Sequence, residues 1–293
     1  MLMDNGGCPG NGWSVITSAP TNSQLAGVLA GFVFTGILIL FGRPGPKNTQ
    51  TLSLFAATFV ILGFDSYLFS LISGGDSDPV CSRVWTESMA ASGMLAAGAT
   101  ALIGGIRWLL AHHLDDEAEG EVPDSNTVDL DRLSLYMLYG VATAVMLLLA
   151  ATTLDYFQVV FEHRAPGWLN WLVSLSPLAV GATAVVLTRR RARRTAVDDS
   201  QQRSNRATRS LSVTAFGLLV YAVVGPVFAG VLTNLPTSLW SPTPALLIVM
   251  GVVIGLVFPA VLLVALIVSA PPISGVVKRT AAERPVEVEG AEQ

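Results

Sequence analysis

Residues 245–270 read ALLIVMGVVIGLVFPAVLLVALIVSA, a stretch of 26 residues without a single charged side chain. An α-helix rises about 1.5 Å per residue, so this stretch is long enough to cross a hydrocarbon core of roughly 30 Å. Residues 24–41 (QLAGVLAGFVFTGILILF) form a similar uncharged stretch. Both stretches therefore predict transmembrane helices.

Five further apolar stretches lie between these two. The seven expected spans are 24–41, 52–72, 89–111, 135–154, 169–187, 211–232 and 245–270. They predict an all-α polytopic membrane protein, a bundle of seven transmembrane helices, preceded by an extracytoplasmic segment (1–23) and followed by a cytoplasmic disordered tail (271–293). The composition agrees, because 52% hydrophobic and only 13% charged residues leave too little polar surface for a water-soluble globule.

The distribution of Lys and Arg predicts the orientation of this bundle. When the spans alternate in direction, Arg83 and Arg164 fall on one side, and the rest of the 17 basic residues fall on the other. Cytoplasmic loops of membrane proteins collect Lys and Arg. We therefore expect an N-terminus outside, a cytoplasmic C-terminus and a multi-pass location in the plasma membrane.

A basic cluster follows the fifth span. It consists of Arg189, Arg190, Arg191, Arg193 and Arg194. Each arginine near an anionic leaflet contributes about 1 kcal/mol of attraction, so the loop at residues 188–210 is expected to lie on anionic lipid headgroups. Docking onto the acidic loop at residues 112–132 or onto a cytoplasmic partner is the alternative. Topology determination alone would also account for the arginines, and no nucleic-acid partner is expected.

Several kinds of chemistry are excluded by the residue types inside the spans. A retinal Schiff base needs a lysine within the bundle, but Lys47 and Lys278 both fall in cytoplasmic segments. Haem and intramembrane zinc need histidines within the spans, and all three histidines lie at or beyond the membrane edges. Phosphate-binding GxxxxGK[ST] and zinc-binding HExxH strings do not occur. We therefore expect a protein that is not an enzyme and has no cofactor or metal.

The most informative polar residue within a span is Asp65, in the string GFDSYLF. It lies about 10 Å below the outer end of the second span, where a carboxylate is costly and is expected to face the bundle or a wet cavity. Glu87 and Asp155 fall near the same outer level, with Tyr67 and Arg83 close by in the sequence. These residues predict an outward-facing acidic pocket for a cation, a proton or an amine. The alternative is that neighbouring hydroxyls or Arg83 hold Asp65, while the other two acids sit in interfacial water.

Small residues in the third span predict a face for close helix packing. Gly93, Ala97, Ala101 and Gly105 recur at every fourth position and so lie on one side of a helix. Such faces let helix backbones approach closely. The contact is expected within the bundle, with a homo-oligomer or a membrane partner as the alternative.

The chain has two cysteines, Cys8 and Cys81, and both fall on the expected extracytoplasmic side. Disulfides form on that side of the membrane. We therefore predict a Cys8–Cys81 disulfide, with two free thiols as the alternative.

Two classes of function remain open. The first is a non-enzymatic sensor, receptor-like protein or accessory subunit that signals through its charged cytoplasmic loops. The second is a transporter or channel component that uses Asp65, with helices broken at Pro177, Pro226 and Pro259 as moving parts. The sequence slightly favours the first class, because spans one, five and seven hold almost none of the polar groups that transporters place near the midplane.

Overall fold

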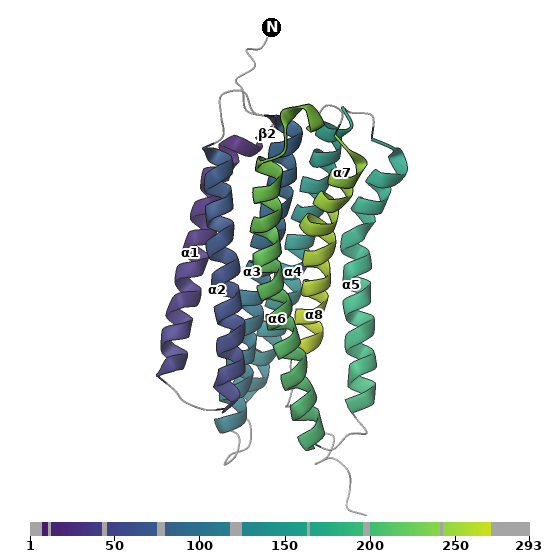
Figure 1. Cartoon of the computed structure of the whole chain (residues 1–293). Coiled ribbons are helices and arrows are strands. Elements are labelled where there is room, and N and C mark those ends of the chain that lie inside the picture. The colour runs from purple at the N-terminus through teal and green to yellow at the C-terminus, as the bar shows by residue number, and fades with distance from the viewer. Residues whose placement is uncertain are drawn as a thin grey trace, which may run out of the picture.

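The computed structural model describes residues 8–10, 13–42, 46–74, 80–117, 125–162, 165–195, 200–240 and 243–270. Within these ranges, seven helices are long and apolar enough to cross a membrane. They lie side by side in one bundle (Figure 1). The predicted all-α bundle of seven helices is therefore confirmed, and its contact with a lipid bilayer follows from the apolar helices. The expected tail at 271–293 lies outside the described residues.

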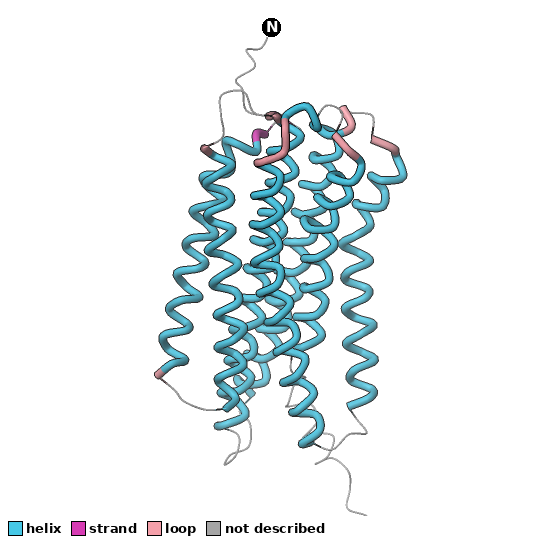
Figure 2. Tube along the Cα trace, viewed as in Figure 1, coloured by secondary structure: helices cyan, strands magenta, loops and turns pink. Residues whose placement is uncertain are grey.

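The first six spans are continuous helices. They are α1 (Val15–Phe41), α2 (Pro46–Ser73), α3 (Cys81–Glu117), α4 (Ser125–Val160), α5 (Gly167–Thr195) and α6 (Ser200–Thr233). The seventh span is built from α7 (Ala245–Val252), the π-helical segment η2 (Val253–Val257) and α8 (Phe258–Ser269). A short 3-10 helix, η1 (Thr237–Trp240), lies between α6 and α7, and β1 (Pro9–Gly10) pairs antiparallel with β2 (Trp13–Ser14) before α1. Figure 2 shows these elements by type.

The helices extend beyond the apolar stretches that predicted them. α1 begins at Val15, well before residue 24, because the Ser14 side chain caps it by accepting a hydrogen bond from the Thr17 backbone N–H at 3.3 Å. α3 begins at Cys81 and not at residue 89. The apolar stretches therefore mark the parts of the helices that fit in hydrocarbon, and polar residues continue the helices at both ends.

α3 is the central helix of the bundle. It contacts α1, α2, α4, α6 and all three parts of the seventh span, and it is the most buried of the seven spans. α1 packs mainly against α2 at one edge, and α5 packs against α4 and α8 at the other (Figure 1). Residues on α3 are therefore the ones that can meet side chains from most other helices.

The small-residue face of α3 packs within the bundle. Ala97 and Ala101 are fully buried, and Gly105 lies beside the ring of Phe55 on α2. Gly93 lies against Tyr221 of α6 and Gly255 of η2. The intramolecular contact expected from the sequence is what the structure has, so this face is not open to a second copy or to a membrane partner.

The predicted disulfide is present and joins Cys8 to Cys81, the first residue of α3. We call this end of the bundle the disulfide end, and we call the opposite end, where Arg189 and Arg190 lie on α5, the arginine end. α2 and α6 run toward the disulfide end, whereas α3 and the seventh span run away from it. These directions decide which residues share a level in the bundle.

Candidate functional site

Asp65 lies on α2 inside the bundle and is fully buried, with 0% of its surface exposed. Neither of its carboxylate oxygens has a hydrogen-bond partner in the part of the chain that the structure describes. An ionised carboxylate removed from water without a partner costs several kcal/mol. Burial of Asp65 as a carboxylate is therefore costly.

The groups that the sequence offered as partners for Asp65 bond elsewhere. The Thr58 hydroxyl donates to the carbonyl of Leu54 on its own helix, at 2.7 Å. The Ser66 hydroxyl donates to the carbonyl of Ser23 on α1, at 2.9 Å. Arg83 lies one helical turn from Glu87 and faces that residue. In the structure, therefore, neither these hydroxyls nor Arg83 forms a hydrogen bond with Asp65.

Tyr221 of α6 is also fully buried, and it lies near enough to Asp65 for the charge of the carboxylate to act on its hydroxyl group. The Tyr221 hydroxyl donates to the backbone carbonyl of Ile254 in η2, at 2.7 Å. In a π-helix that carbonyl would accept from the N–H five residues later, and the residue there is Pro259, which has no N–H. Tyr221 therefore satisfies a carbonyl that Pro259 leaves free.

Close helix contacts hold Tyr221 in this position. A Cβ at Gly93 would meet the Tyr221 hydroxyl, and a Cβ at Gly255 would lie 2.6 Å from the carbonyl oxygen of Met89. α3, α6 and η2 thus approach one another at glycines, directly around the tyrosine hydroxyl. The pair of Asp65 and Tyr221 is built from α2 and α6 and is supported by α3 and η2.

A cleft of about 230 Å³ lies between α2, α3 and α6, toward the disulfide end. It is lined by Tyr67, Leu68, Leu71 and Ile72 of α2, Glu87 of α3, and Pro226, Ala229, Gly230 and Thr233 of α6. The lining is mostly apolar, and its one carboxylate belongs to Glu87. The cleft is therefore an apolar space with a single acid.

The cleft ends about one helical turn from the buried pair. Leu68 follows Asp65 by three residues on the same face of α2, a rise of roughly 5 Å. On α6, Pro226 follows Tyr221 by five residues, a rise of roughly 7 Å. Asp65 itself does not line the cleft. The two sites are stacked along the same helices, with the cleft nearer the disulfide end.

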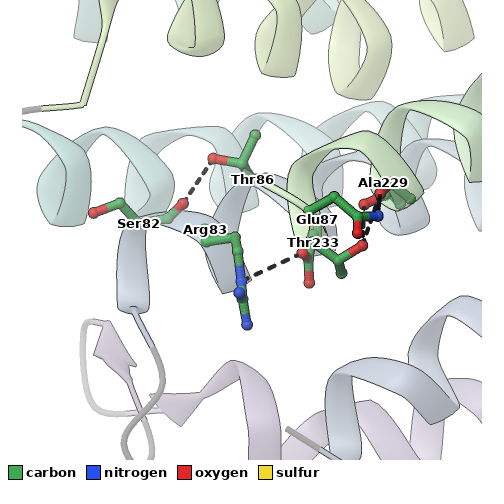
Figure 3. A network of polar contacts seen from close by, with 8 residues as sticks. Ser82, Arg83, Thr86, Glu87, Ala229 and Thr233 are labelled. Carbon is green, nitrogen blue, oxygen red and sulfur yellow. Dashed lines mark hydrogen bonds and ion pairs between the residues drawn. The ribbon is translucent and has the colours of Figure 1, made fainter. Parts of the chain in front are cut away.

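Glu87 is 8% exposed and lies beside Ala229 and Thr233 of α6 (Figure 3). The Arg83 Nε lies 3.6 Å from its Oε1, which makes an ion pair but exceeds hydrogen-bond distance, and neither of these atoms has a hydrogen-bond partner among the described residues. The Thr233 hydroxyl donates its hydrogen to the Gly230 carbonyl at 2.8 Å, so the lone pairs of the Thr233 hydroxyl oxygen can still accept a hydrogen bond. Glu87 therefore keeps hydrogen-bonding capacity that no described residue uses.

Asp155 is not part of the cleft. It accepts a hydrogen bond from Trp13 Nε1 at 2.8 Å, so the strand before α1 covers it. Trp13 packs edge-on against Trp85, whose Nε1 donates to the Cys8 carbonyl. The expected pocket of three acids is therefore divided, with Glu87 in the cleft, Asp65 beneath it and Asp155 under the disulfide-linked N-terminal strand.

Three of the remaining predicted site residues, Tyr67, Arg189 and Arg190, lie at the surface. Tyr67 is 61% exposed at the rim of the cleft. Arg189 and Arg190 are exposed at the arginine end of α5. The side chains of Arg191, Arg193 and Arg194 lie outside the described residues. Within the described residues, no group of three or more His, Cys, Asp or Glu side chains is placed to hold a metal ion.

Comparison of the chain with known protein families, with characterised proteins and with solved structures gives no match.

The sequence reasoning missed Tyr221 and the Ile254 carbonyl. A tyrosine in the middle of an otherwise apolar span, four residues before Gly225-Pro226, was the available signal for the first. Apart from Pro259, no sequence signal points to the Ile254 carbonyl, because the π-helical offset depends on how η2 packs against α3.

Proposed function

We propose that this integral membrane protein is a transporter that takes a monovalent cation or a proton to Asp65 from the disulfide end of the bundle. One observation carries the proposal, namely a fully buried carboxylate without a hydrogen-bond partner, one helical turn below a cleft. Ionisable residues inside membrane spans are expensive, and they generally mark ion or substrate pathways. A bound cation or proton would offset the cost of burying Asp65.

A proline within α6 and the π-helical segment of the seventh span lie next to the buried pair and supply candidate moving parts. Pro226 removes a backbone hydrogen bond from α6 at the floor of the cleft, and η2 interrupts the seventh span beside Tyr221. π-helical segments are rare and occur frequently at functional sites. Transporters commonly place their sites at such discontinuous helices. Movement of α6 against η2 would open Asp65 to the arginine end.

The orientation belongs to the same proposal. Disulfides persist in oxidising compartments, which supports an extracytoplasmic disulfide end. The arginines at the other end support a cytoplasmic location under the positive-inside rule, with the basic loop at 188–210 on anionic headgroups. The cleft would then face outward in the plasma membrane.

The test is ion flux into proteoliposomes that contain the full-length protein. Radioactive sodium, radioactive rubidium and an entrapped pH-sensitive dye report Na⁺, K⁺-like and H⁺ movement. We expect one of the three to move in wild type and to stop in Asp65→Asn, because the amide carries no charge and no titratable proton.

The matched control is Asp155→Asn, the same change at a buried acid outside the cleft. Its amide oxygen still accepts from Trp13, so flux is expected to stay at the wild-type level. Equal flux in wild type and Asp65→Asn would contradict the proposal. Cation binding at Asp65 without flux would replace transport with the sensor class.

A further inference from the structure

The cleft has a charge and a shape that the proposed role of Asp65 does not use. Its walls are apolar, from Leu68, Leu71, Pro226 and Ala229, and Glu87 is its one acid. Glu87 is more than nine-tenths buried and its Oε1 has no hydrogen-bond partner among the described residues. A buried acid that lines an apolar cleft suits a ligand with one positive end and an apolar body.

We infer that the cleft binds a small amphipathic organic cation, with its ammonium group at Glu87 and its apolar part against α2 and α6. This inference gives the proposed transporter a second ligand beside the ion at Asp65. It rests on the proposed function only for the transport of that ligand, since binding to the cleft stands by itself.

A divalent inorganic ion fits the cleft poorly. Ca²⁺ takes six to eight oxygen ligands and Mg²⁺ takes six, whereas the cleft offers the carboxylate of Glu87 and the hydroxyls of Thr233 and Tyr67. Arg83 already offsets part of the Glu87 charge, at 3.6 Å. The site therefore favours a ligand of charge one that makes up its binding with apolar contact.

The size of the cleft sets the size of the ligand. A cavity of about 150 Å³ is known to hold a benzene molecule. The cleft measures about 230 Å³, which leaves room for one ring and a small ammonium group. An ammonium near Tyr67 would also gain from its ring face, since cations bind aromatic rings within about 6 Å.

The rim of the cleft indicates the route by which such a ligand arrives. Tyr67 and Leu71 line the cleft and are at least half exposed on the flank of α2, which the bilayer surrounds. Amphipathic cations concentrate at the membrane interface, with the charge among headgroups and the ring in the acyl region. Access from the side of the bundle therefore matches a ligand that partitions into lipid.

The test is equilibrium binding of phenyltrimethylammonium to the full-length protein in nanodiscs, with empty nanodiscs to subtract partitioning into lipid. The neutral isostere tert-butylbenzene serves as the ligand control, because it has the same shape without the charge. We expect saturable binding of the cation and only lipid partitioning of the neutral compound. Equal saturable binding of both would overturn the inference, because Glu87 would then have no role.

Two variants test the site itself. Glu87→Gln is expected to lower the affinity about tenfold or more by removing the charge. Gly230→Leu is expected to abolish binding by filling the cleft, because a Cβ at Gly230 meets no atom within 4 Å. Gly181→Leu on α5 is the matched control, since it adds the same side chain in open space away from the cleft. Wild-type affinity in both Glu87→Gln and Gly230→Leu would overturn the inference.

The inference and the proposed function fail separately. Asp65 does not line the cleft, so Asp65→Asn is expected to keep phenyltrimethylammonium binding while ion flux stops. Unchanged flux in Asp65→Asn with weakened binding in Glu87→Gln would reject the transporter and keep the cleft. Loss of flux in Asp65→Asn, together with wild-type binding in both Glu87→Gln and Gly230→Leu, would keep the transporter and reject the ligand site in the cleft.

Discussion

Single residues decide how closely the central helices approach, and Gly93 lies where α3 meets both α6 and η2. A Cβ there would collide with the Tyr221 hydroxyl and would lie 2.8 Å from the Gly255 carbonyl oxygen. The carbonyl belongs to the backbone and cannot rotate away. The absence of a side chain at Gly93 is therefore a condition for the contact between α3, α6 and η2.

Gly93→Ala is expected to lower the free energy of unfolding by about 1–3 kcal/mol through overpacking, although alanine favours a helix over glycine by about 1 kcal/mol. Gly181→Ala on α5 is the control, because nothing lies within 4 Å of a Cβ there, and it should be neutral or slightly stabilising. Unfolding in a detergent titration measures both. If Gly93→Ala and Gly181→Ala unfold at the same detergent concentration, the contact at Gly93 accommodates the added methyl group without loss of stability.

At the scale of single residues, the sequence predicted that Asp65 is buried, but it did not predict how its neighbours are bonded. Asp65 stood out because a carboxylate ten ångströms or so inside a span is rare. Its lack of a partner was not predictable, because Thr58 and Ser66 had equally good acceptors on α2 and α1, and only the packed helices show which were used. Asp155 was misplaced in the expected pocket because nothing in the sequence linked it to Trp13.

Among the elements, the seventh span shows how a proline is accommodated in a membrane helix. Pro259 cannot donate a hydrogen bond, so the helix widens into η2 and the free Ile254 carbonyl takes the hydroxyl of Tyr221. The sequence predicted an interruption at Pro259. It did not predict a π-helical segment, because an ordinary kink would also avoid the ring.

A double-mutant cycle tests this compensation. Tyr221→Phe alone is expected to cost about 1–3 kcal/mol, since it leaves a buried carbonyl without a donor. In a Pro259→Ala background the backbone N–H returns and can satisfy the Ile254 carbonyl, so Tyr221→Phe should cost about 1 kcal/mol less. Detergent unfolding of the four proteins measures the coupling. Additive effects would show that Tyr221 and Pro259 act independently.

For the molecule as a whole, the number of spans followed from the lengths of the apolar stretches, while the arrangement around α3 did not. Each stretch is long enough to cross the bilayer by itself. Which helix becomes central depends on pairwise contacts, and the glycines and alanines of α3 gave the one hint of it. The covering of Asp155 by the N-terminal strand is a long-range contact of the same kind, fixed by the disulfide.

The orientation in the membrane is a prediction for the whole molecule. A reporter that is active only in the cytoplasm should be active when fused after Arg194 and silent when inserted after Gly74, because the arginines hold their end inside. Enzyme activity of the two fusions in intact cells measures this. Activity after Gly74 and silence after Arg194 would invert the bundle and turn the cleft toward the cytoplasm.

The Cys8–Cys81 bond closes a covalent ring around the whole of α1 and α2, since the two cysteines are 73 positions apart. Mechanical load applied at the N-terminus passes through this bond directly into α3, the central helix, and bypasses the two helices inside the ring. The chain between Cys8 and Cys81, which is roughly 250 Å long when fully extended, therefore carries no tension until the bond is reduced. The helix at the edge of the bundle, α1, is therefore anchored by a covalent bond at the disulfide end as well as by its packing on α2.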